Sequence, residues 1–159
     1  MYTIIDLIDK LAEIDKEQYE LYLRISQYIK FEARLQVMSK VFSNQEKKHL
    51  IMFEELKKIS STYDDIEIEF GTYDRAVELI YEFSKIKTKN HINNVEELFN
   101  AALIFEKENL ALVIIIIGLF VKLHNHVETR NYIILSQIMK EEQSHVNLIQ
   151  DILEPNSIN

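Results

Sequence analysis

Two segments of the sequence, "NQEKKHLIMF" at 44–53 and "KEEQSHVNLI" at 140–149, share a pattern in which a histidine follows a glutamate after three residues. Positions i and i+3 of a helix lie on the same face, one turn apart. Glu46 with His49, and Glu142 with His145, can therefore each bind one metal ion through a carboxylate and an imidazole. A single E-x-x-H pattern is common by chance, but two copies in a chain with five histidines indicate a metal site.

Both motifs lie on helix faces that are otherwise apolar. On a helical wheel that turns about 100° per residue, Glu46 and Glu142 each fall in the middle of such a face, while Lys47, Lys48 and Gln143 point outward. The apolar residues on the two faces are Leu35, Met38, Phe42, Phe53 and Leu56 in the first copy, and Leu135, Ile138, Ile149 and Ile152 in the second. We therefore expect both glutamates and both histidines to face the protein interior.

Two further helices each place one acid on their apolar face. Glu106 shares its face with Ala102 and Val113, and Asp15 lies beside Gln18 on the apolar face of the first helix. For Asp15 an alternative without metal stays open, in which this buried aspartate is hydrogen-bonded to Tyr22. The sequence thus predicts one inward carboxylate from each of four helices.

Four buried carboxylates need compensation, because an isolated buried charge would take up a proton. Two divalent cations carry four positive charges, which match the charge of the four carboxylates, and each imidazole can supply a neutral nitrogen. The predicted ligands of two metal ions are Asp15, Glu46, His49, Glu106, Glu142 and His145.

The ligands are carried by four long helices, which apolar periodicity predicts at 3–29, 33–59, 94–122 and 127–153. The chain contains only two glycines and one proline, which also favours an all-α fold. We expect a single domain, 1–159, in which an antiparallel hairpin at 3–59 is joined to a second at 94–153. The connecting residues 60–93 are expected to form an irregular crossover around Gly71, followed by a short outer helix. Capping-box spacing marks three helix starts, at Thr3/Asp6, Asn94/Glu97 and Asn125/Glu128.

Composition excludes several classes of function. A net charge of −8 without a basic stripe argues against a nucleic-acid partner. The absence of cysteine excludes thiolate metal sites and cysteine nucleophiles. Asp6 and Asp9 interrupt the segment where a secretory signal would be apolar, so we expect a cytoplasmic protein. The apolar run at 110–121 is too short to span a bilayer, so no membrane association is expected.

The combination of motifs resembles the rubrerythrin branch of the ferritin-like superfamily along nearly the whole chain. The half-repeat of that family, Ala-x3-Glu-x6-Tyr followed by Glu-x-x-His, is matched by Ala102 and Glu106, and by Asp15 and Tyr22 at the family spacing. The resemblance implies a ferritin-like four-helix bundle with a di-iron centre and Tyr22 as the inward, catalytic phenol. It departs from the family where Asp15 replaces glutamate, Val113 replaces a second tyrosine and Asn109 replaces a further acid.

The implied function is reduction of peroxide or dioxygen by two iron ions, since such a pair can deliver two electrons together. Rubrerythrins proper carry a cysteine-ligated rubredoxin module, which this chain lacks, so the electrons are expected to come from an external donor protein. Ferrous iron oxidation or iron handling is one alternative. A structural site that holds zinc or manganese without redox chemistry is the other.

The segment "LALVIIIIGLFV" at 110–121 is apolar around its whole circumference. We therefore expect a homodimer built across this segment, and expect Leu112→Glu or Ile116→Glu to disturb association. The crossover is long enough for two geometries. Each chain can complete its own bundle, or the two chains can exchange hairpins so that ligands from both contribute to each site.

Overall fold

The computed structural model describes residues 2–28, 32–60, 67–88, 95–124 and 130–154. These residues form five α-helices, and no strand occurs among them beyond an isolated bridge between Thr3 and Glu67. The helices are α1 (Ile4–Gln27), α2 (Ala33–Ser60), α3 (Phe70–Thr88), α4 (Val95–His124) and α5 (Arg130–Leu153). The predicted all-α fold is confirmed.

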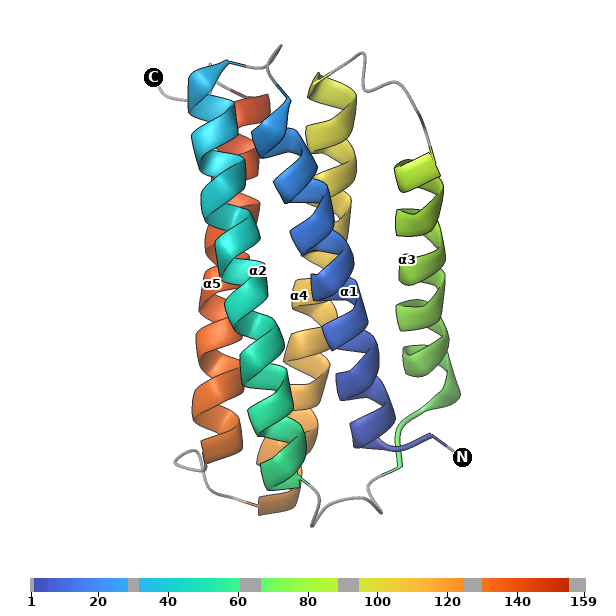
Figure 1. The fold of residues 1–159 in the computed structure, drawn as a ribbon. Helices are drawn as coiled ribbons and strands as arrows, with labels where there is room; N and C mark the ends of the chain where they lie inside the picture. The colour runs from blue at the N-terminus through green and yellow to red at the C-terminus, as the bar shows by residue number, and fades with distance from the viewer. Residues whose placement is uncertain (1, 29–31, 61–66, 89–94, 125–129, 155–159) are drawn as a thin grey trace.

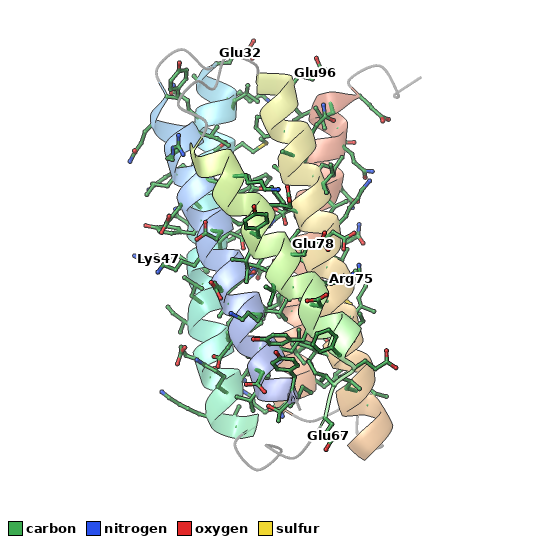
Figure 2. All side chains as sticks on the ribbon, turned by 90° about the vertical axis from the view of Figure 1, so that its right-hand side faces the viewer. Glu32, Lys47, Glu67, Arg75, Glu78 and Glu96 are labelled. Carbon is green, nitrogen blue, oxygen red and sulfur yellow. The ribbon has the colours of Figure 1, made fainter. Side chains whose placement is uncertain are left out.

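Four helices, α1, α2, α4 and α5, run side by side and enclose a common core (Figure 1). α1 is antiparallel to α2, and α4 is antiparallel to α5, so each pair forms a helical hairpin. α2 and α4 run in the same direction, which requires the chain between them to return along the length of the bundle. α3 makes this return on the outside, where it packs mainly against α1 and also contacts α4 (Figure 2).

The start of α1 follows the predicted capping box. The backbone N–H of Thr3 donates to Asp6 Oδ2 at 2.7 Å, and the backbone N–H of Asp6 donates to Thr3 Oγ1 at 3.3 Å, so two free donors of the first turn are satisfied. The proposed caps Asn94 and Asn125 lie outside the described residues. α5 is described from Arg130 onward, and the helix start expected at residue 127 also lies outside the described residues.

The outer helix begins earlier than expected. Gly71 was expected in an irregular crossover, but α3 begins at Phe70 and includes it. The carbonyl of Glu69 accepts the backbone N–H of Thr72 at 3.0 Å, which starts the helix. Tyr73 then stacks on Tyr2 with ring centroids 3.7 Å apart, so aromatic packing against the N-terminal segment offsets the low helix propensity of the glycine.

The apolar segment 110–121 of α4 faces both the core and the surface. Leu112 and Ile116 are 1% and 0% exposed and belong to the core of their own chain. The prediction that Leu112→Glu or Ile116→Glu would act on association is therefore wrong. A glutamate at either position would instead place a charge inside the bundle. The outer side of the segment carries Ile114, which is 49% exposed, together with Gly118 and Val121.

Among the residues that the structure describes, no helix is both long enough and apolar enough to cross a bilayer.

Candidate metal centre

Six ionisable side chains from four helices meet in the middle of the bundle. α1 supplies Asp15 and α4 supplies Glu106, while α2 and α5 each supply a glutamate and a histidine. The six predicted ligands are all buried, namely Asp15, Glu46, His49, Glu106, Glu142 and His145. Lys47, which follows Glu46 in the sequence, extends away from the bundle (Figure 2). The prediction that these six side chains face the interior is confirmed.

The Nδ1 atom of His49 lies close to three carboxylates. It is 3.2 Å from Asp15 Oδ2 and 3.3 Å from Glu46 Oε2. The same atom is 3.2 Å from Glu142 Oε1. One nitrogen therefore lies among acids from three different helices.

His145 occupies the corresponding place in the second half of the chain. Its Nδ1 atom is 3.0 Å from Glu46 Oε1 and 3.6 Å from Glu106 Oε2. Glu142 Oε2 is 3.8 Å away. The two imidazole rings stack with centroids 6.3 Å apart, so the two halves of the cluster are adjacent.

The six side chains form two overlapping groups, each with ligand atoms within 4.8 Å of one another. Position 1 consists of Asp15, Glu46, His49 and Glu142, and position 2 consists of Glu46, Glu106, Glu142 and His145. In the part of the chain that the structure describes, these are the groups with a geometry suited to a metal ion. Glu46 and Glu142 belong to both positions, so these two carboxylates can bridge two ions.

Many carboxylate oxygens and imidazole nitrogens of the cluster have no hydrogen-bond partner, so they are available as metal ligands. The buried atoms without such a partner include both carboxylate oxygens of Glu46, one oxygen each of Asp15, Glu106 and Glu142, and Nδ1 of His49 and His145. Leaving buried polar atoms unpaired is costly, and a native protein contains few of them. Seven such atoms converging on one place are the arrangement that bound cations would satisfy.

Burial and charge act in opposite directions on the two histidines. Burial by itself would lower the pKa of each imidazole, since it disfavours the charged form. The surrounding carboxylates outweigh burial, so the pKa of His145 rises to about 10, with Glu106 as the strongest partner. The pKa of His49 is also raised strongly, led by its contact with Asp15. The carboxylates thus favour a positive charge at both positions.

The carboxylates respond differently according to their neighbours. Burial raises the pKa of Asp15 to about 7, although contact with His49 opposes this. Burial and the nearby charge of Glu46 also raise the pKa of Glu142. For Glu106 burial acts upward, but the charge of His145 outweighs it and the pKa is lowered. The carboxylates and imidazoles of the cluster therefore share protons among themselves. A metal ion that binds these groups would displace the protons.

Tyr22 contacts the cluster at position 2. It is fully buried, and its hydroxyl donates a hydrogen bond to Glu106 Oε1. The alternative in which Tyr22 bonds Asp15 is wrong, because the phenol reaches across to α4 instead. Asp15 is held by Asn109 and lies close to His49.

Asn109, for which the sequence suggested no role, connects three helices. Its Nδ2 atom donates to Asp15 Oδ1 at 2.8 Å and to Glu142 Oε1 at 3.1 Å, with Gln18 Oε1 at 3.2 Å. The residue lies one turn after Glu106, on the face already predicted to be inward, and this spacing was the available signal. A neutral donor here orients two carboxylates without adding a fifth negative charge.

Gln45 and Glu141 also contact the cluster, and neither was expected there. His49 Nε2 is 2.9 Å from Glu141 Oε2, and His145 Nε2 is 2.8 Å from Gln45 Oε1. Each of these residues directly precedes the glutamate of the opposite E-x-x-H motif. Of the remaining histidines, His91 and His126 lie outside the described residues.

Comparison of the chain with models of protein families, with curated proteins and with solved structures finds no match.

Proposed function

We propose that this protein is a di-iron oxidoreductase of rubrerythrin type, which reduces peroxide or dioxygen with electrons from an external donor protein. The observation that carries the proposal is the pair of overlapping ligand groups, each with one imidazole, one unshared carboxylate and the two shared carboxylates Glu46 and Glu142. Shared carboxylates hold two ions close together, as two-metal chemistry requires. The order and direction of α1, α2, α4 and α5 support a ferritin-like arrangement of the bundle.

Iron suits these ligands because carboxylate oxygens and imidazole nitrogens bind both of its common oxidation states. If two ferrous ions were held by these ligands, they would supply two electrons, and one hydrogen peroxide would take up two electrons and two protons to give two water molecules. Burial of all six ligands limits the access of water, and Tyr22 holds a proton on its hydroxyl beside Glu106. We infer that Tyr22 is the catalytic phenol, positioned to give that proton to a reduced oxygen species.

Anaerobic reconstitution with ferrous iron tests this function. We expect two iron ions to bind per chain and one equivalent of hydrogen peroxide to oxidise both, which rapid-mixing absorbance and iron analysis would measure. Tyr22→Phe should still bind two ions yet react more slowly, by at least about tenfold if its proton takes part in the reaction.

Other outcomes would support different functions. Faster oxidation by dioxygen than by peroxide, with ferric iron accumulating beyond two ions per chain, would support iron handling. Bound ferrous iron that reacts with neither oxidant would contradict the redox proposal and favour a structural zinc or manganese site. Unchanged kinetics in Tyr22→Phe would remove the tyrosine from the reaction but leave the metal centre in place.

We also propose that the protein is a homodimer built across the exposed side of segment 110–121. Ile114 and Val121 expose apolar surface beside Gly118, which leaves room for the close approach of a second backbone. Ile114→Glu should convert the dimer to an 18.9 kDa monomer in sedimentation velocity, without loss of helix content. Ile104→Glu, at another exposed position of α4 outside this segment, is the matched control. A wild-type protein that sediments only as a monomer would rule out the dimer.

One chain supplies all six ligands in this structure, so the dimer needs no exchange of hairpins to complete the site.

A further inference from the structure

The two histidines are supported from behind by groups of different charge. Glu141 contacts the Nε2 atom of His49 at 2.9 Å, and Gln45 contacts the Nε2 atom of His145 at 2.8 Å. The two contacts are equivalent by position, since each partner residue precedes the glutamate of the opposite motif. The two halves of the site thus share one geometry, but a carboxylate supports one imidazole and a neutral amide supports the other.

These contacts determine which ring nitrogen can bind a metal. A carboxylate oxygen and an amide oxygen both accept a hydrogen bond, so Nε2 of each histidine carries the hydrogen. The Nδ1 lone pair then points into the cluster, where it lies 3.2 Å from Asp15 Oδ2 in His49 and 3.0 Å from Glu46 Oε1 in His145. A carboxylate behind an imidazole raises its basicity as a ligand more than an amide does, because the hydrogen bond is charge-assisted.

The other supporting contacts do not cancel this difference. Asp15 accepts a hydrogen bond from Asn109, and Glu106 accepts one from Tyr22, so the unshared carboxylate of each position has one neutral hydrogen-bond donor. The shared pair, Glu46 and Glu142, contributes to both positions. Behind the two imidazoles, the supporting groups therefore differ in formal charge, with Glu141 at position 1 and the neutral Gln45 at position 2.

We propose that the two metal positions are inequivalent, that position 1 binds a divalent ion more tightly and fills first, and that Glu141 is the positioning residue responsible. This inference rests on the proposed two-metal site but not on any redox reaction. Replacing a group that supports a metal-ligating histidine changes metal affinity by about 10- to 100-fold, which sets the size of the expected difference.

Titration of the metal-free protein with Mn²⁺ tests the order of filling. We expect calorimetry to show two steps, the first at least about tenfold tighter than the second. Electron paramagnetic resonance should show an isolated bound ion at the first equivalent and a magnetically coupled pair at the second. His49→Ala should remove the tight step, and His145→Ala should remove the weak one.

Two near-isosteric substitutions then test the role of Glu141. Glu141→Gln should weaken the tight step by about tenfold and leave the weak step unchanged, while Gln45→Glu should tighten the weak step by a similar factor. A structural effect would instead alter both steps together, and melting of the metal-free variants would reveal a loss of stability. The inference is overturned if the wild type binds two ions in one indistinguishable step, or if neither substitution changes the steps selectively. Absence of Mn²⁺ and Fe²⁺ binding in the wild type would instead overturn the two-metal site itself.

Discussion

Glu46→Gln is expected to abolish the binding of both metal ions, whereas Asp15→Asn is expected to abolish only one. Glu46 belongs to both ligand groups, and its two oxygens face the two histidines at 3.3 Å and 3.0 Å. Asp15 belongs to position 1 alone. Loss of the Glu46 charge should weaken binding at each position by more than about 100-fold, since even indirect support of a ligand accounts for 10- to 100-fold. Iron or manganese analysis after dialysis measures the two stoichiometries.

The design of this experiment separates metal binding from folding. Glutamine preserves the shape of glutamate, so Glu46→Gln leaves no cavity, and a histidine that loses this partner can release its proton. The metal-free variant should therefore remain helical and melt cooperatively. Glu54→Gln, which removes an exposed acid from the same helix, is the matched control and should bind two ions. Two ions bound to Glu46→Gln would show that Glu46 is not a shared ligand.

The inward ligands could be predicted from sequence because each is a polar residue on an otherwise apolar helix face. Glu46 and His49 differ from their neighbours in type, and the spacing of three residues requires that they share a face. Burial of Asp15 follows by the same reasoning, without knowledge of any partner helix. A charged residue within an apolar stripe is thus sufficient to locate a buried site.

The supporting residues could not be predicted in this way. Gln45 precedes an inward glutamate, so the helical wheel places it at the edge of the face, where contact depends on the distance to the next helix. Contact of Gln45 with His145 arises only when α2 and α5 pack together. The alternative in which Tyr22 bonds Asp15 could not be tested from sequence for the same reason, because the partner of the phenol, Glu106, depends on which helices are neighbours.

The orientation of segment 110–121 shows a different limit. The run contains no polar side chain of its own, and the inward face that Glu106 and Val113 define was not extended to Leu112 and Ile116. Asn109 marks the same inward face, and residues seven apart lie on nearly the same face of a helix, which includes Ile116. Both Asn109 and Ile116 are fully buried in the structure. A role for Asn109 at the site would therefore have indicated that Ile116 is a core residue.

Thermal stability should depend on pH in opposite ways with and without metal. In chelator, the folded chain holds protons that the unfolded chain releases, since the pKa of His145 is raised from 6.5 to about 10. The pKa of Asp15 is likewise raised, from 3.8 to about 7. A raised pKa in the folded state stabilises the protein fully below the unfolded value, and this stabilisation is lost as pH rises through the folded value. The melting temperature of the metal-free protein should therefore fall between about pH 5 and about pH 9.

Metal ions reverse this trend because they bind the deprotonated ligands. Binding releases protons, so the affinity for metal, and with it the added stability, increases with pH. The gap between melting temperatures in excess Mn²⁺ and in chelator should widen across the same range. The lowered pKa values of Glu106 and Glu141 affect stability only below about pH 4.5, outside this window. In Glu46→Gln the gap should vanish at every pH, because metal no longer binds. A metal-free melting temperature that rises toward pH 9 would contradict the electrostatic account of the cluster, since it would mean that the folded chain holds fewer protons than the unfolded one.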